Sequence, residues 1–343
     1  MVRAAIAAVH PLWAVEGGVV TISGAGFQVD PLPEVLIGGV PARLLRASST
    51  LLAAQVPSGL DGGRTPIRVE GSPGETAFVE IGAPLATGLH QVDNPAFDDD
   101  GNLYVTFSGS RGQESPVSVF VVRQDGSREP FVSGLPNPTS MVFGRDGHLY
   151  VSSRFDGSVH RVARDGSTTT YATDLGVACG IAFGPDGALY VGDRSGSILR
   201  VLQGAVSVFA SLPGSVAAFH LAFGPDGALY VAGPTLSPRD PVYRLSRAGE
   251  VSIFYEGFGR PQGLAFDADG RLYVVDSLAG ASGVFRFDVG AAPTQPEPVV
   301  VGGSLIGLAF DPRGGLVLAS SDTAYRLDVP LRGALVDAPR GAG

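Results

Sequence analysis

The chain has 343 residues, a formal net charge of -9 and 24 basic residues, all of which are arginine. Without lysine, a Schiff-base or lysine-nucleophile mechanism is excluded, and the acidic balance argues against nucleic acid and anionic membranes as partners. A single cysteine, Cys179, excludes an internal disulfide and a metal site built from several cysteines. No apolar run approaches the roughly 20 residues of a membrane helix. No signal peptide is visible, so we expect a cytoplasmic protein, with secretion left open.

Residues 1–82 contain short apolar segments separated by Gly and Pro, at 19–23, 34–37, 51–56, 65–70 and 76–81. This pattern predicts a small antiparallel β-sandwich. The landmarks His10-Pro11, Gly24-Ala25-Gly26-Phe27 and Gly38-Gly39 resemble those of the IPT/TIG family of immunoglobulin-like domains. The resemblance implies a spacer or an assembly module, and therefore a possible contact with a protein partner.

The rest of the chain repeats one pattern six times: a Phe, a turn containing Gly, and then Leu-Tyr-Val, or Leu-Val-Leu in the last copy. The Phe residues stand at 97, 143, 183, 223, 266 and 310, so the period is 40 to 46 residues. Short strands with a period of roughly 40–50 residues predict propeller blades. The sixth copy lacks a fourth strand, and residues 85–89 supply a matching segment. We therefore expect an all-β chain with a six-bladed propeller at 83–330, closed by an N-terminal strand, and a flexible tail at 331–343.

Two features that recur in the blades are expected to be structural. The Asp-Gly pairs lie between the first two strands of a blade, where Gly supplies the positive φ of a hairpin turn. An arginine recurs in the third strand of five blades, at 161, 200, 244, 286 and 326. Because they repeat, we assign both to the construction of the blade.

Candidate functional residues stand where the repeats differ, on the face that carries the starts of the first strands and the ends of the second strands. We call this face the mouth. Its polar candidates are Asp93, Asn94, Thr139, Cys179, Asp193, His220, Gln262 and Asp276, with Arg154 and Arg194 beside them. An oxygen-rich ring with carboxylates suits a hard cation such as calcium. A polar, water-filled mouth without a ligand is the alternative.

The sequence allows two interpretations for several of these candidates. His220 is either a general base or metal ligand, or a hydrogen-bonded packing residue. Cys179 faces the mouth, and an inert small residue is favoured over a reactive one. Arg154 and Arg194 either clamp a carboxylate or phosphate, or pair with Asp156 and Asp193.

The repeat Pro261-Gln262-Gly263-Leu264-Ala265-Phe266, continued to Asp276, resembles the regucalcin/gluconolactonase family. It also resembles NHL-repeat propellers and streptogramin lyase. Gluconolactonase-like enzymes are calcium- or zinc-dependent lactone hydrolases with ligands four residues before the repeated aromatic. Carried over, these ligands fall on Asp93 and Gln262, whereas the third position holds Phe219, which cannot bind a metal.

The resemblance implies a metal-dependent hydrolase of a lactone or small ester, with calcium favoured over zinc. In this hypothesis Asp93 and Gln262 hold the metal, and Asp276, Asp193 and His220 are the catalytic candidates. Arg154, Arg194, Asn94, Thr139 and Cys179 are the substrate-binding candidates. The alternative is a non-catalytic, NHL-like propeller that binds a small ligand or a protein, with the N-terminal domain as its assembly module.

Overall fold

The computed structural model describes residues 4–72, 76–112, 115–278, 282–289 and 295–334. Every regular element within these ranges is a strand, which confirms the predicted all-β class. In the same part of the chain, no helix is long and apolar enough to cross a membrane.

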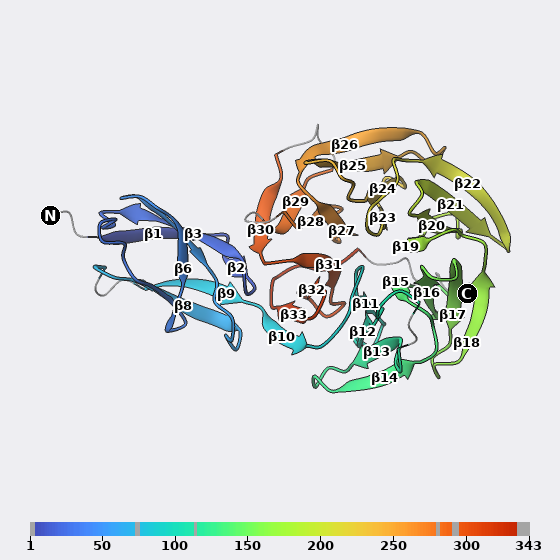
Figure 1. The fold of residues 1–343 in the computed structure, drawn as a ribbon, viewed down its shortest axis with the longest axis horizontal. Helices are drawn as coiled ribbons and strands as arrows, with labels where there is room; N and C mark the ends of the chain where they lie inside the picture. Colours follow the sequence, from blue (N-terminus) through green and yellow to red (C-terminus); the bar gives the residue numbers. More distant parts are fainter. Residues whose placement is uncertain (1–3, 73–75, 113–114, 279–281, 290–294, 335–343) are drawn as a thin grey trace, which may run out of the picture.

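The N-terminal domain is a sandwich of two sheets (Figure 1). One sheet has the order β1-β3-β7-β6, from β1 (Ala5–His10), β3 (Val19–Ala25), β7 (Leu51–Gln55) and β6 (Arg43–Ala47). The other runs β2-β9-β8-β4-β5, from β2 (Trp13–Ala14), β9 (Ala77–Ile81), β8 (Gly63–Val69), β4 (Val35–Ile37) and β5 (Val40–Pro41). Ile22, Leu52 and Ile67 are fully buried in the core. The five strands expected from the sequence are present, and β1, β2, β5 and β6 are additional.

The remaining strands form six groups of four around a common centre, a count that fits the predicted propeller (Figure 1). Blade one has β11 (Ala96–Phe97), β12 (Leu103–Thr106), β13 (Val119–Val122) and β14 (Arg128–Val132). Blade two has β15 (Pro138–Phe143), β16 (Leu149–Ser153), β17 (Ser158–Val162) and β18 (Thr168–Ala172). Blade three has β19 (Ala178–Phe183), β20 (Leu189–Asp193), β21 (Ser197–Leu202) and β22 (Ala205–Ser211).

Blade four has β23 (His220–Phe223), β24 (Leu229–Ala232), β25 (Asp240–Leu245) and β26 (Val251–Phe258). Blade five has β27 (Pro261–Phe266), β28 (Leu272–Asp276), β29 (Gly283–Phe287) and β30 (Glu297–Val301). Blade six has β31 (Leu305–Phe310), β32 (Leu316–Ser320) and β33 (Ala324–Leu327), and its fourth strand is β10 (Ala83–Ala86).

The ring is closed by chain that precedes blade one, as the sequence predicts. β10 pairs antiparallel with β33, with Ala83 opposite Arg326. The paired segment begins two residues before the expected range of 85–89, and contacts continue beyond it. The amide of Leu89 donates to the carbonyl of Asp322 at 2.9 Å, and the amide of Gln91 donates to that of Ser321 at 3.0 Å. Because a paired edge no longer presents free backbone groups, this strand protects the open side of blade six.

The recurring Asp, Tyr and Arg residues form one contact unit, shown here by blade four. The carboxylate of Asp226 accepts hydrogen bonds from Tyr230 and from Nη2 of Arg244, the latter at 2.7 Å. Blades two and three repeat this unit with the trios Asp146, Tyr150, Arg161 and Asp186, Tyr190, Arg200. The turn glycines have positive φ, for example +73° at Gly227. The predicted structural role of these residues is confirmed.

The repeated Phe explains how the blades adhere to one another. In each of five neighbouring pairs, the Tyr of one blade meets the Phe of the next at ring-centroid distances of 4.9 to 5.2 Å. These edge-to-face pairs add to the burial of apolar area. Blade six has Val317 instead of Tyr, and there Phe97 packs on an aliphatic cluster.

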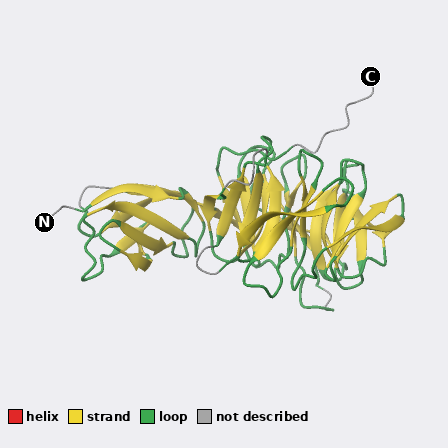
Figure 2. Cartoon of the chain, turned by 90° about the horizontal axis from the view of Figure 1, so that it is seen from above, coloured by secondary structure: helices red, strands yellow, loops and turns green. Residues whose placement is uncertain are grey.

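The N-terminal domain is joined to the propeller by shared sheet pairing. β2 lies between β9 and β30 and is parallel to both, so the sandwich and blade five form one nine-stranded sheet. Tyr325 of blade six donates to Glu16 at 2.8 Å. The sandwich lies beside the rim of the propeller and leaves both faces of the disc uncovered (Figure 2).

The first residues of the predicted flexible tail make backbone hydrogen bonds to the propeller. Ala334 donates its amide to the carbonyl of Phe266 at 3.0 Å, and Arg332 accepts from Ala268 at 2.8 Å. Residues 332–334 therefore lie along blade five. Residues 335–343, which belong to the same prediction, lie outside the described residues.

Candidate functional site

The pairing of first and second strands brings the predicted mouth positions together. Ala178 stands opposite Asp193, and His220 stands opposite Ala232. Pro261 stands opposite Asp276 in blade five. The starts of the first strands and the ends of the second strands therefore share one face, as the repeat register predicts.

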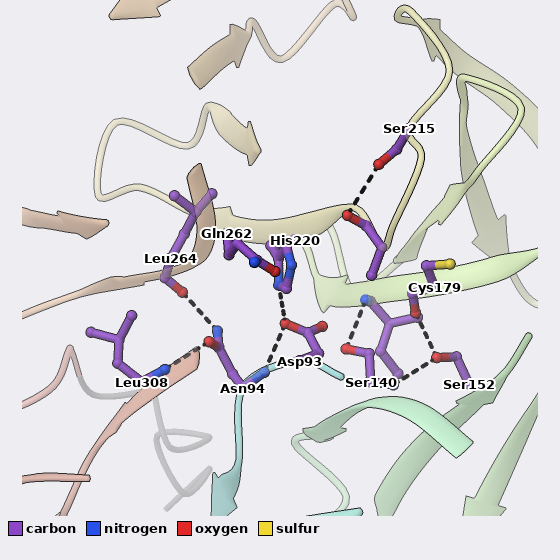
Figure 3. A network of polar contacts seen from close by, with 12 residues as sticks. Asp93, Asn94, Ser140, Ser152, Cys179, Ser215, His220, Gln262, Leu264 and Leu308 are labelled. Carbon is purple, nitrogen blue, oxygen red and sulfur yellow. Dashed lines mark hydrogen bonds and ion pairs between the residues drawn. The ribbon is translucent and has the colours of Figure 1, made fainter. Parts of the chain in front are cut away.

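Two of the candidates from opposite parts of the ring form a buried acid–base pair (Figure 3). Nδ1 of His220 lies 2.5 Å from Oδ1 of Asp93, although the residues are 127 positions apart in the sequence. Their side chains are 0% and 4% exposed. Nε2 of His220 is buried and has no hydrogen-bond partner within the described residues. The pair therefore leaves one imidazole nitrogen buried and without a partner in the described chain.

Unpartnered buried polar atoms concentrate at this face. Of five such atoms in the described chain, four belong to mouth residues: Gln91, Ser108, Arg154 and His220. A buried polar atom without a partner costs free energy, so folded proteins keep few of them and functional sites are one place where they persist. Their clustering marks the mouth as the candidate site.

Asn94 connects three blades and is a structural residue. Its Nδ2 donates to the carbonyl of Leu264 at 2.9 Å, and its Oδ1 accepts the amide of Leu308 at 2.9 Å. A Cβ at Gly263 would stand 2.3 Å from this Oδ1, and one at Gly307 would stand 2.8 Å from the Asn94 Cα. Glycine is therefore required at both positions, and the amide of Asn94 is already engaged at both ends. These contacts do not support its predicted role in binding substrate.

The two carboxylates predicted as catalytic residues accept hydrogen bonds from loops of the mouth. Asp276 accepts the amides of Gly259 at 3.1 Å, Arg260 at 2.7 Å and Leu278 at 3.3 Å. Asp193 accepts the amide of Val177 at 2.8 Å and two donors of Ser195. Asp193 and Asp276 thus stand at equivalent positions of two blades and both accept amides of a loop. The sequence already showed an aspartate at this position in both blades. Neither contact set supports the catalytic role.

Cys179 and Thr139 are closed off from solvent, each with 1% of its surface exposed. Burial raises the pKa of the Cys179 thiol to about 12, so the thiol is protonated at neutral pH. Thr139 donates to the carbonyl of Asn137 at 3.1 Å. In the free protein neither side chain is available to a substrate, which favours the inert interpretation of Cys179.

Gln262, Arg154 and Arg194 are half-buried residues of the mouth. Gln262 donates from Nε2 to Ser277 at 3.2 Å. Arg194 donates from Nη2 to the carbonyl of Val216 at 2.9 Å, and Arg154 reaches the carbonyl of Gly109 at 3.5 Å. The predicted alternative, pairing of these arginines with Asp156 and Asp193, does not occur among the described residues.

Two further basic residues near Arg154, His90 and Arg111, were not identified from the sequence. Burial, and then the charge of Arg154, lower the pKa of His90. The charge of Arg111 lowers the pKa of Arg154. Both stand in the chain around blade one, where the first copy of the repeat is least regular, and no spacing in the sequence indicates them.

The predicted ligand positions do not fit a calcium site. Calcium takes six to eight oxygen ligands, whereas Asp93 is the only carboxylate at the ligand slots, and its Oδ1 is bound by His220 and by the amide of Asn94. The third slot holds the buried, apolar Phe219. No group of three His, Cys, Asp or Glu residues in the described ranges is arranged to hold a metal ion.

The chain is similar to known families and structures. The family model described as "SMP-30/Gluconolactonase/LRE-like region" matches residues 155–337, more than half of the 343 residues. The IPT/TIG domain model matches residues 4–79. No curated protein sequence matches the chain.

Solved structures show the same fold at low sequence identity. A gluconolactonase from Xanthomonas campestris has 18% identity and a TM-score of 0.58, and the match covers 73% of this chain and 89% of that one. Virginiamycin B lyase from Staphylococcus aureus has 17% identity and a TM-score of 0.55, over 86% of this chain and 100% of that one. A structural-genomics protein of unknown function from Bacteroides thetaiotaomicron has 15% identity and a TM-score of 0.58, over 95% and 98%.

The match over residues 155–337 and the propeller fold agree with the repeat pattern of the sequence. The chain belongs to the SMP-30/gluconolactonase/LRE-like family and carries an IPT/TIG domain at its N-terminal end.

Proposed function

We propose that this gluconolactonase-like propeller hydrolyses a lactone or small ester at its mouth, with His220 as the general base. The observation that supports this best is the state of the His220 ring: Asp93 binds Nδ1, and Nε2 is buried without a partner in the described chain. A packing histidine would be expected to satisfy both nitrogens. Retention of an open nitrogen favours a role in proton transfer.

The proposed chemistry follows from this arrangement. As a carboxylate, Asp93 accepts a hydrogen bond from Nδ1–H of His220, so the lone pair resides on Nε2. Nε2 takes a proton from a water molecule while the water oxygen forms a bond to the carbonyl carbon. The ester C–O bond then breaks, and the same proton passes to the leaving alkoxide oxygen to give a hydroxy acid. Asp93 holds the ring in orientation and compensates its transient positive charge.

Two other functions are compatible with the same residues. A divalent metal held by Asp93 and Gln262 is the alternative within the hydrolase class. The second alternative is a non-catalytic mouth that only binds a ligand, and the complete burial of His220, at 0% exposure, favours it. Dependence of hydrolysis on a metal would distinguish the first alternative from the proposal, and binding without turnover would distinguish the second.

The test is a pH-drift assay of the purified chain on a panel of lactones and small esters, with and without EDTA. Hydrolysis that resists EDTA is expected. His220→Gln should lower kcat by about 10²- to 10⁴-fold, because general-base catalysis is lost. Asp93→Asn should also lower kcat, because an amide no longer selects the tautomer with the lone pair on Nε2.

His148→Gln is the matched control, because His148 lies in the turn on the opposite face and contacts Asp146. Its kcat should equal that of the wild type. Full activity of His220→Gln would refute the proposal. Loss of activity in EDTA, restored by calcium or zinc, would favour the metal-dependent alternative, and ligand binding without turnover would favour the binding protein.

A further inference from the structure

We propose that Arg154 and Arg194 form an anion subsite at the mouth, which receives a carboxylate or phosphate group of the ligand. The inference rests on the proposed function for the location of the substrate. It adds the chemical class: a lactone or ester that carries a negative charge.

The two arginines occupy the same place in neighbouring blades. Arg154 follows β16, and its amide donates to the carbonyl of Asn137 at 3.3 Å. Arg194 follows β20, and its amide donates to the carbonyl of Val177 at 3.2 Å. Each arginine therefore directly follows the second strand of its blade, and its backbone is hydrogen-bonded to the residue that precedes the first strand of that blade. The backbone places both side chains on the mouth face.

Neither guanidinium has a carboxylate partner within the described residues. Arg194 donates to the carbonyls of Ser215 at 3.4 Å and Val216 at 2.9 Å. Arg154 makes one long contact, 3.5 Å to Gly109, and its Nε is buried without a partner in the described chain. Carbonyl contacts orient a guanidinium but leave its charge uncompensated.

This differs from the scaffold arginines of the same protein. Arg161, Arg200 and Arg244 each contact an aspartate at 2.7 to 2.9 Å. In a chain with a net charge of -9, acidic partners are abundant. Two neighbouring half-buried arginines that have no carboxylate partner in the described ranges are therefore a specific local feature of the mouth.

Positive charge also accumulates around Arg154. Burial lowers its pKa, and the charges of Arg194 and Arg111 lower it further. A partly buried cation among like charges is destabilised, and an anion would remove that penalty. The planar guanidinium matches the two oxygens of a carboxylate or phosphate. Ser108 adds a buried hydroxyl without a partner in the described residues, on the loop where its amide donates to His90.

The charges of the subsite and the charge of Asp93 act on the same group, the thiol of Cys179. Burial has the largest effect on the pKa of the Cys179 thiol and raises it. The charges of Arg194, Asp93 and Arg154 follow: the two arginines lower this pKa and Asp93 raises it. All three charges therefore act at one buried point of the mouth. In this proposal the anionic group of the ligand lies at the arginines and its ester group lies toward His220.

The experiment measures binding and turnover separately. Isothermal titration with inorganic phosphate, D-gluconate and neutral D-glucose tests binding without reference to activity. We expect phosphate or gluconate to bind and glucose not to bind. Arg154→Gln and Arg194→Gln should each weaken anion binding at least tenfold. Arg145→Gln, an exposed arginine in the turn of blade two on the opposite face, is the matched control and should bind normally.

The thermal midpoint separates a binding role from a structural one. Arg154→Gln removes an uncompensated charge, so its midpoint without ligand should equal or exceed that of the wild type, and phosphate should raise only the wild-type midpoint. Failure of both anions to bind the wild type, or anion binding by both arginine variants as tight as that of the wild type, would overturn the subsite.

Turnover distinguishes this inference from the proposed function. Glucarolactone, which carries a carboxylate, should be hydrolysed with a higher kcat/KM than neutral gluconolactone, and Arg154→Gln should remove the preference. Anion binding without hydrolysis would support the subsite and refute the hydrolase. Hydrolysis without anion preference would support the hydrolase and refute the subsite.

Discussion

Single residues of the mouth differ in whether their hydrogen bonds are complete. Asn94, Asp193 and Asp276 are polar and lie at the predicted face, but backbone groups occupy their side-chain atoms. His220 and Arg154 each retain a buried nitrogen without a partner in the described chain. Because folding gains nothing from an unsatisfied group, the second kind of residue is the better candidate for function.

Cys179 gives a prediction at this scale. Burial raises its pKa to about 12 from an ordinary value of 9.0, and the thiolate is the reactive form. At pH 8 the folded protein should not react with a thiol reagent such as iodoacetamide, whereas the protein unfolded in urea should react quickly. Mass spectrometry of the alkylated chain measures this. Rapid alkylation of the folded protein would place Cys179 in the open mouth and restore it as a substrate contact.

At the scale of elements, two short strands determine how the parts of the chain are connected. β10 completes blade six, so the ring depends on residues that precede its first repeat. β2 contributes only two residues, yet it joins the sheet of the sandwich to blade five. Val15, directly after β2, is fully buried in a cluster formed with blades five and six. The N-terminal domain is thus packed as part of the propeller.

Val15→Ala should therefore destabilise the whole chain. It removes two buried methyl groups at the junction, and large-to-small changes of this kind cost about 2 kcal/mol. We expect one cooperative urea transition in the wild type and a lower midpoint in the variant, followed by circular dichroism. Val40→Ala, at a 36% exposed position of the same domain, should leave the midpoint nearly unchanged. Two separate transitions in the wild type would show that the junction does not couple the domains.

At the scale of the whole molecule, the repeated aspartates make stability depend on pH. Partial burial tends to raise the pKa of Asp226, but hydrogen bonds from Arg244, the amide of Ala228 and Tyr230 outweigh it, so the pKa lies below its usual 3.8. The pKa values of Asp146 and Asp186 are lowered in the same way. A group with a lowered folded-state pKa contributes stability above its unfolded pKa and loses it as the pH falls.

The free energy of unfolding should therefore decline below about pH 4, as these carboxylates become protonated. Urea midpoints at pH 7, 4 and 3 measure the decline. Asp226→Asn removes one titrating group, so the variant should be less stable at pH 7 and should lose less stability between pH 7 and 3. An unchanged difference between the two pH values would show that this carboxylate does not contribute to acid lability.

The repeat made the fold predictable from sequence. Phe, Asp-Gly and Leu-Tyr-Val recur at a period of 40 to 46 residues because most blades use the same turn, the same Tyr–Phe contact and an Asp–Arg pair. Such local requirements are written in neighbouring residues. The same regularity predicted the ring-closing strand and the face on which Asp93 and His220 lie.

Only the tertiary structure decided which mouth residues are structural and which are left open. Asp93 and His220 are 127 positions apart and meet only because the ring brings blades one and four to a common centre. The sequence by itself determined the repeat, the propeller, its closure and the N-terminal sandwich, because these follow from short-range patterns. The pairing of Asp93 with His220 and the engaged amide of Asn94 depend on contacts between blades, which no local pattern contains. The same holds for the Nε of Arg154, which has no partner among the described residues.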